Sequence, residues 1–244
     1  MLHNKLSHTK RSLSDQIRDQ IIEMLETEEF PTNKLPAESK LAKRFGVSIN
    51  VVREALLLMR EEGLITKKHG SGNYFHLSAL SASNRIDQIP DFEDLLRASG
   101  FDAYQPPLKL DRILPPEHVR VVLRLQPGEL ALHYTSTIYA DGDPAILCKS
   151  WFPDKYFRID PVGAPLDVDF FDLLLHYFDR ELAYGQMEFL AESATERERD
   201  QLGLELGSPY IVMEESFYSL EDTPLVFSRN KFNKKYMSAR VFCV

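Results

Sequence analysis

Residues 35–72, LPAESKLAKRFGVSINVVREALLLMREEGLITKKHGSG, decide the fold of the N-terminal part of the chain. A helix is predicted to begin at Pro36 and to end at Gly46, since proline suits the first turn of a helix and glycine the residue that ends it. A second helix is predicted from Ser48, a good N-cap residue, to Gly63, because apolar residues recur between them at helical spacing.

The sequence on both sides of these two helices completes the pattern. Residues 12–28 have the apolar periodicity of an amphipathic helix. Residues 64–69 and 73–76 predict two strands joined by a turn at Gly70-Ser71-Gly72. Three helices followed by a two-stranded hairpin with a glycine-containing tip predict a winged helix-turn-helix, in which the third helix can lie in the major groove of DNA.

Polar side chains on the third helix and on the wing supply the expected DNA contacts. Arg53 suits guanine or phosphate, and Asn50 suits adenine or phosphate. Glycines in the wing permit close approach of the backbone to the duplex. The candidate DNA-binding residues are Lys43, Arg44, Ser48, Asn50, Arg53, Lys67, Lys68, His69, Gly70, Ser71 and Gly72.

The charge of the chain is distributed unevenly. The 244 residues carry a net charge of −8, which alone argues against nucleic acid as a partner. Residues 1–77, however, hold twelve Lys and Arg against ten Asp and Glu, while residues 78–244 hold seventeen against twenty-seven. The acidity therefore belongs to the C-terminal part, and a mildly basic DNA-binding part remains consistent with the composition.

The composition also indicates where in the cell the protein is located. No apolar run approaches the roughly 20 residues that span a bilayer, and the N-terminus lacks the apolar core of a signal peptide. The two cysteines cannot form a disulfide framework. These features predict a cytoplasmic protein without a membrane partner.

The rest of the chain predicts a linker at residues 78–90 and a second domain at 91–244, after a first domain at 1–77. In the second domain, hairpin signals at Asp141-Gly142-Asp143 and Glu221-Asp222 alternate with short helices, which predicts an α+β fold with an antiparallel sheet. A strand is expected over 104–114 and a helix over 169–182. The charge run 196–200 is expected to be a solvated helix face.

The N-terminal domain resembles the DNA-binding domain of GntR-type bacterial transcription regulators. The resemblance rests on Leu35-Pro36-Ala37-Glu38, Phe45-Gly46-Val47-Ser48, Val52-Arg53-Glu54-Ala55-Leu56, Glu62-Gly63-Leu64-Ile65 and His69-Gly70-Ser71-Gly72. Ile49 stands where the family has its first recognition-helix arginine, Val51 where a threonine is usual, and Ser39 where a basic residue sometimes occurs. These departures leave the fold intact but imply an operator sequence that differs from the usual one.

The C-terminal domain resembles the UTRA effector-binding domain of the HutC subfamily, whose fold is related to chorismate lyase. The resemblance rests on residues 92–100, on Ala140-Asp141-Gly142-Asp143-Pro144 with Ser150-Trp151-Phe152-Pro153, on Leu202-Gly203-Leu204 and on residues 223–228. It implies a small-molecule sensor that also dimerises the protein.

The resemblance also implies which small molecule is disfavoured. The two arginines that grip the anion in phosphosugar-sensing relatives fall on Ser136 and Ile138, and a phosphate-binding threonine falls on Glu93. A buried anion needs paired donors, so we expect an effector that is not a phosphosugar. The candidate effector-binding residues are Glu93, His133, Ser136, Ser150, Ser228 and Arg229.

The sequence thus predicts a transcription regulator, expected to be a repressor, that binds double-stranded operator DNA as a homodimer and responds to an effector. No catalytic pair, metal-ligand spacing or phosphate loop stands out, so no enzyme, metal or cofactor is predicted. Two alternatives stay open at this stage. One is a constitutive dimeric DNA-binding protein without effector, and the other is an enzyme built on the chorismate-lyase-like domain.

Overall fold

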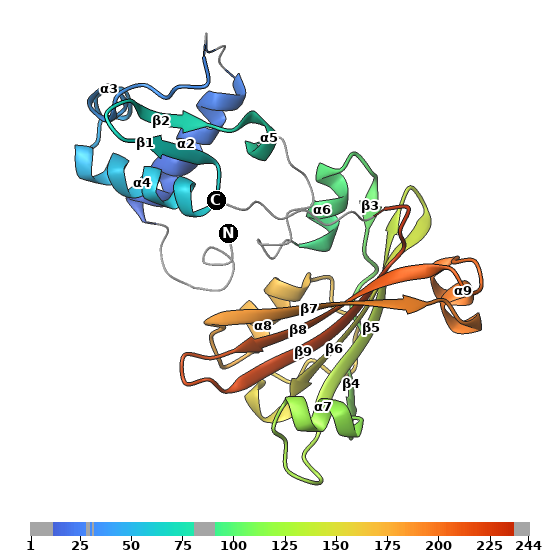
Figure 1. The fold of residues 1–244 in the computed structure, drawn as a ribbon. Coiled ribbons are helices and arrows are strands. Elements are labelled where there is room, and N and C mark those ends of the chain that lie inside the picture. The colour runs from blue at the N-terminus through green and yellow to red at the C-terminus, as the bar shows by residue number, and fades with distance from the viewer. Residues whose placement is uncertain (1–11, 28–29, 31, 81–90, 237–244) are drawn as a thin grey trace. The chain divides into compact units, whose positions relative to one another are not determined.

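The structure is a computed structural model that describes residues 12–27, 30, 32–80 and 91–236 (Figure 1). The chain divides into two compact units. One holds the described residues between 12 and 80, and the other holds those between 91 and 236. Across these described ranges, no helix is both long and apolar enough to cross a membrane.

The smaller unit is the predicted winged helix-turn-helix. Its elements are α2 (Leu13–Thr27), α3 (Glu38–Phe45), α4 (Ile49–Glu61), β1 (Ile65–Lys68), β2 (Gly72–Phe75) and the short α5 (Leu77–Leu80). Gly46 ends α3 in the left-handed conformation, with φ of 68°, and the Ser48 hydroxyl caps α4 by accepting a hydrogen bond from the Val51 N–H at 3.3 Å. Both turn residues of the predicted helix-turn-helix therefore act as their chemistry suggests.

A single apolar core holds the three helices and the wing together. Ile21 of α2, Leu41 of α3, and Val52 and Met59 of α4 are fully buried in it. Ala79 and Leu80 of α5, which the sequence placed in the linker, pack with the same core. The remainder of the predicted linker, 81–90, lies outside the described residues.

The larger unit is α+β, as predicted. Its elements are α6 (Phe92–Ala98), β3 (Ala103–Tyr104), β4 (Asp111–Ile113), α7 (Glu117–Val122), β5 (Ala131–Ala140), β6 (Asp143–Pro153), the 3₁₀ turn η1 (Asp154–Tyr156), α8 (Phe170–Tyr177), β7 (Tyr184–Ser193), α9 (Glu196–Leu202), β8 (Pro209–Tyr218) and β9 (Pro224–Phe232). The strands described in this unit form one antiparallel sheet in the order β3-β5-β6-β9-β8-β7, with β4 also pairing with β5.

The β5–β6 hairpin is closed by a two-residue turn inside the predicted Asp141-Gly142-Asp143 signal. Ala140 pairs with Asp143, while Asp141 and Gly142 have φ of 51° and 84°. Positive φ at both central residues is what a type I′ turn requires, and it matches the right-handed twist of the two strands.

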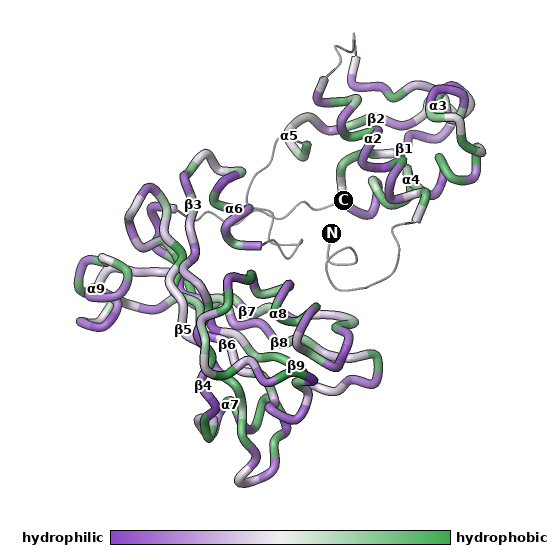
Figure 2. The backbone as a smooth tube through the Cα atoms, turned by 180° about the vertical axis from the view of Figure 1, so that it is seen from behind, coloured by the Kyte–Doolittle hydropathy of each residue, from purple (hydrophilic) through white to green (hydrophobic). Residues whose placement is uncertain are grey.

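The sheet has two faces that pack against different helices. We call inner the face that carries Tyr134, Cys148 and Phe217, which packs against α6 and α8. We call outer the opposite face, where Trp151 and Phe227 pack with α7, and Leu147 and Val212 pack with α9. Figure 2 shows the resulting alternation of hydrophobic and hydrophilic residues along the chain.

Three local predictions were wrong. The strand expected over 104–114 is two strands, β3 and β4, because Pro106 and Pro107 between them cannot donate to a ladder. The helix expected over 169–182 ends at Tyr177, where Phe178 turns extended and forms an isolated bridge with Phe157.

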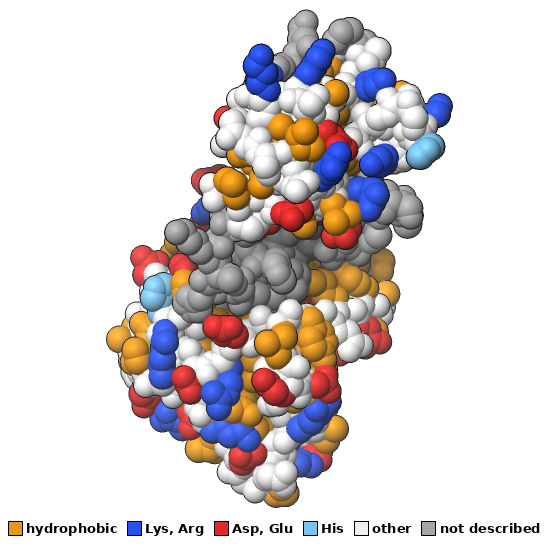
Figure 3. Space-filling model, turned by 90° about the vertical axis from the view of Figure 1, so that its left-hand side faces the viewer, with side chains coloured by type: hydrophobic (Ala, Val, Ile, Leu, Met, Phe, Trp, Pro, Cys, Tyr) orange, Lys and Arg blue, Asp and Glu red, His pale blue; other side chains and the backbone are white. Residues whose placement is uncertain are grey.

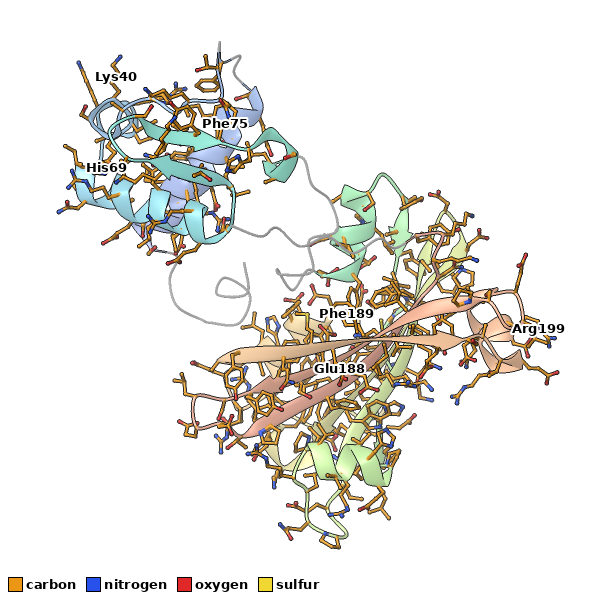
Figure 4. All side chains as sticks on the ribbon, in the orientation of Figure 1. Lys40, His69, Phe75, Glu188, Phe189 and Arg199 are labelled. Atoms are coloured by element: carbon orange, nitrogen blue, oxygen red, sulfur yellow. The ribbon has the colours of Figure 1, made fainter. Side chains whose placement is uncertain are left out.

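The third wrong prediction concerns the charge run 196–200. Glu198 is buried rather than solvated, since its carboxylate accepts a hydrogen bond from Lys231 Nζ at 2.6 Å and completes a capping box with Thr195. Its neighbour Arg199 conforms to the prediction and points away from the sheet (Figure 4).

Candidate nucleic-acid interface and effector cavity

A groove on the winged helix brings together the start of α3, the start of α4 and the wing. Its lining includes Arg53 from α4, Lys67 from β1, and Ser71 and Gly72 from the wing turn, all four of them predicted DNA-binding residues. Glu38 lies at the N-terminal end of α3 in the same groove. Two cations, Arg53 of α4 and Lys67 of β1, therefore border one concave surface, where they can contact a phosphate backbone or a base edge.

Arg53, like Lys67, is an exposed cation of this groove. Its side chain is 62% exposed, and its Nε donates a hydrogen bond to Glu38 Oε2 at 2.7 Å. An ion pair this exposed contributes little to folding, so the guanidinium can exchange Glu38 for a DNA acceptor at small cost.

The tip of the wing is basic and glycine-containing. Lys68, His69 and Gly70 are exposed there, and Figure 4 shows His69 pointing outward. Gly72 has φ of 116°, and a Cβ at this position would stand 3.2 Å from Lys34 Cε, so a side chain would be both strained and crowded. The Ser71 hydroxyl is hydrogen-bonded to the Tyr74 hydroxyl at 2.6 Å, which ties the turn to β2.

The remaining predicted DNA-binding residues lie on the exposed surface of α3 and α4. Lys43 and Arg44 occupy the last turn of α3, and Asn50 the first turn of α4; all three are exposed but do not line the groove. Ser48 has a structural task as the N-cap of α4. Figure 3 shows Lys and Arg side chains gathered on the surface of this unit, with acidic side chains between them.

Sequence reasoning missed Lys34. This residue precedes α3 in a segment without periodicity, yet it forms an isolated bridge with Tyr74 and lines the groove beside Arg53 and Lys67. Its Nζ lies 6.0 Å from the centre of the Tyr74 ring. No local pattern signals such a residue, because the bridge to β2 arises only when the wing folds back.

A cavity lies against the inner face of the larger unit, between the sheet and helices α6 and α8. Its lining residues are Asp91, Phe92, Gln105, Tyr134, Ile138, Cys148, Ser150, Phe170, Phe171, Glu215, Phe217, Ser228 and Asn230. The cavity is partly open to solvent. The mixture of apolar walls and a few convergent polar groups is typical of small-molecule sites.

The polar floor of the cavity is made by β6, β9 and β8. The hydroxyls of Ser150 and Ser228 are hydrogen-bonded to each other at 2.8 Å. Beside them, Asn230 Nδ2 donates to Glu215 Oε2 at 2.6 Å. Glu215 is only 5% exposed, and burial raises its pKa to about 8, so its carboxyl is largely protonated at neutral pH in the unliganded protein.

Two of the six predicted effector-binding residues, Ser150 and Ser228, line this cavity. Ser136 lies on the inner face and is buried, but it is not among the lining residues. Glu93 accepts hydrogen bonds from Arg97 Nη2 at 2.8 Å and from the Gln105 N–H at 3.0 Å, and so serves to fasten α6 rather than to line the cavity.

His133 and Arg229 lie on the outer face, away from the cavity. The His133 ring stacks on Trp151 with 4.6 Å between ring centres, and burial lowers its pKa. Arg229 donates to Glu214 at 2.8 Å and also pairs with Glu192. Successive residues of a strand point to opposite faces, so a shift of one residue in the alignment moves a side chain from the cavity to the other side of the sheet.

Glu215 and Asn230 were the important residues that sequence reasoning missed. A signal for Glu215 did exist: it sits between Met213 and Phe217 at the apolar positions of an alternating strand, where a carboxylate is otherwise costly. Nothing in the sequence of β9 comparably distinguished Asn230 from a solvated residue.

Comparisons with known proteins agree with this architecture. Residues 13–75 match the model of the gntR family of bacterial regulatory proteins, and residues 107–238 match the UTRA domain. The chain is 24% identical to the mannosyl-D-glycerate transport/metabolism system repressor MngR of Escherichia coli over 91% of its own length and 90% of that protein. It is 25% identical to the transcriptional regulator TreR of Bacillus subtilis, over 82% and 84%.

Solved structures show the same fold. The transcriptional regulator YydK of Bacillus subtilis superposes with a TM-score of 0.77 at 19% identity, over 96% of this chain and 100% of that one. PhnF of Mycobacterium smegmatis superposes with a TM-score of 0.57 at 16% identity, over 93% and 99%. With a winged helix-turn-helix at one end and a UTRA domain over more than half of its length, this chain belongs to the gntR family of bacterial regulatory proteins and is a DNA-binding transcription regulator with an effector-binding domain.

Proposed function

We propose that the protein is a cytoplasmic, homodimeric repressor of the HutC subfamily, which binds a pseudo-palindromic operator and changes its affinity for DNA when a small molecule occupies the inner-face cavity. The observation that carries the DNA-binding part is the groove in which Arg53, Lys67 and Lys34 meet. The predicted DNA-binding residues outside this groove, on α3 and at the wing tip, are assigned contacts with flanking phosphates.

Dimerisation follows from the weakness of a single head. A DNA-binding part with a net charge near +2 neutralises few phosphates and holds DNA weakly by itself. Two heads on one site raise the effective concentration of the second. In support, β7 is a ten-residue edge strand with Phe189 exposed on it, a surface that a second copy of the chain can cover (Figure 4).

The lining of the cavity supports an effector that is not a phosphosugar. No Lys, Arg or His is present among its lining residues in the described part of the chain, whereas Asp91 and Glu215 contribute carboxyl groups. A dianionic phosphate placed there would meet no compensating charge. Ser150 and Ser228 are the predicted residues that we retain as effector contacts.

Footprinting of the DNA upstream of the gene itself tests the proposal. We expect two protected half-sites whose centres lie about one helical turn of DNA apart, or a multiple of it. In vitro transcription from the same fragment then shows whether the protein represses or activates transcription. We expect repression that a compound relieves. An affinity that no candidate compound alters would favour the constitutive DNA-binding alternative, and turnover of chorismate by the purified chain would favour the enzyme.

A further inference from the structure

The inner-face cavity presents hydrogen-bond acceptors without a fixed cation. Glu215 Oε2 is engaged by Asn230, but no hydrogen bond to its Oε1 occurs among the described residues. When it is ionised, the carboxyl of Glu215 is a strong acceptor at the cavity wall, and the residue is only 5% exposed. A buried carboxylate is stable only with a paired counter-charge or when it is protonated.

The walls around this acceptor are aromatic. Four phenylalanines line the cavity: Phe92 from α6, Phe170 and Phe171 from α8, and Phe217 from β8. Aromatic rings attract cations over their faces and offer apolar area to the rest of a ligand. The charged group of an anionic ligand gains nothing from the ring faces, and it is repelled by Glu215 once that carboxyl is ionised.

We propose that the effector is a primary amine with an apolar body, whose ammonium group donates to Glu215 and whose body packs on the phenylalanine walls. Ser150 and Asn230 would take the remaining N–H donors. This inference rests on the proposed function, because it names the ligand class of the same cavity.

The proton balance of binding follows from the groups that face Glu215. Tyr134 of β5 and Cys148 of β6 line the cavity beside it, and burial raises the pKa of both, so they stay neutral near pH 8. Asp91 accepts backbone N–H bonds at the start of α6. Glu215, whose pKa is about 8 when the cavity is empty, must lose its proton to pair with an ammonium, and that proton leaves to the buffer.

Calorimetry on the full chain, with three probes of similar shape, tests this. The probes are 2-phenylethylamine, 2-phenylethanol and phenylacetate, which are cationic, neutral and anionic. The amine keeps its proton below about pH 9, as lysine does. We expect it to bind at least tenfold more tightly than the other two at pH 8.5, to weaken about tenfold or more at pH 6.5, and to release close to one proton per site at the lower pH.

Glu215→Gln keeps the shape and the contact with Asn230 but removes the charge. It should abolish both the preference for the amine and its pH dependence. Glu205→Gln, between α9 and β8, is exposed and lies outside both the cavity and β7, so it is the matched control and should bind all three probes like the parent protein. An amine that binds no better than the alcohol, or not at all, would overturn the proposal, as would a preference for phenylacetate. Operator binding without any probe is measured in parallel, so failure of the ligand class is distinguished from failure of the regulator itself.

Discussion

Replacing Arg53 by alanine should separate DNA recognition from folding. The Arg53 side chain is 62% exposed, and its ion pair is with a partly exposed Glu38, so its loss should change the free energy of unfolding by less than about 1 kcal/mol. A contact to a base edge is worth about 1–3 kcal/mol per head. With two heads on one operator, the combined loss is about 2–6 kcal/mol, or roughly 30-fold to 10⁴-fold in affinity.

Fluorescence anisotropy with a labelled operator fragment at fixed salt measures this loss, and circular dichroism checks the fold. Arg60→Ala is the matched control, since Arg60 is exposed in the last turn of the same helix but does not line the groove. Glu38→Gln should strengthen binding to any DNA sequence, because it removes an anion from the groove and leaves Arg53 unpaired. An Arg53→Ala protein that binds the operator within twofold of the parent would refute the assignment of the groove.

Three further expectations concern the larger unit, whose buried Trp151 is the single tryptophan of the chain and reports on unfolding of this unit by fluorescence. Glu198→Gln should destabilise it by about 3 kcal/mol in urea, because Lys231 is left buried without its counter-charge; a shift below 1 kcal/mol would contradict this. Burial raises the pKa of Glu198, but hydrogen bonds from Lys231 and Thr195 outweigh it and hold the pKa at about 2. The stabilisation by this pair should therefore be complete above about pH 4.5 and be lost as the pH falls toward 2, which urea midpoints across that range will test against the glutamine variant. Gly142→Ala should destabilise by about 1–2 kcal/mol through strain at φ of 84°, since its Cβ would contact nothing within 4 Å, and Gly142→Asn should recover most of the loss; equal urea midpoints for all three proteins would argue against the turn as described.

The winged helix could be predicted from the sequence because its determinants are local. Gly46, Ser48 and Gly70 each act within a few residues of their own position, through a helix end, a helix cap and a turn. Lys34 escaped prediction for the opposite reason, since only the return of β2 brings Tyr74 beside it.

The effector cavity was harder to predict because it is assembled from strands that are distant in the sequence. Ser150 and Ser228 are 78 positions apart and become neighbours only through the β6–β9 pairing. An error of one residue in a strand alignment is enough to assign His133 or Arg229 to the wrong face. The buried Glu198 was missed for a related reason: its partner Lys231 lies on β9, 33 positions away.

The separation of the two faces bears on how such a sensor can change its ligand over time. On β6, Ser150 faces the cavity, while its neighbours Lys149 and Trp151 face the opposite side of the sheet. There Trp151 packs against α7. A substitution at Cys148 or Ser150 of this strand alters what the cavity recognises and leaves the contacts of α7 and α9 untouched. Single substitutions can therefore change the ligand preference without unfolding the domain. The same fold can come to bind a new class of ligand while the packing of the outer face stays unchanged.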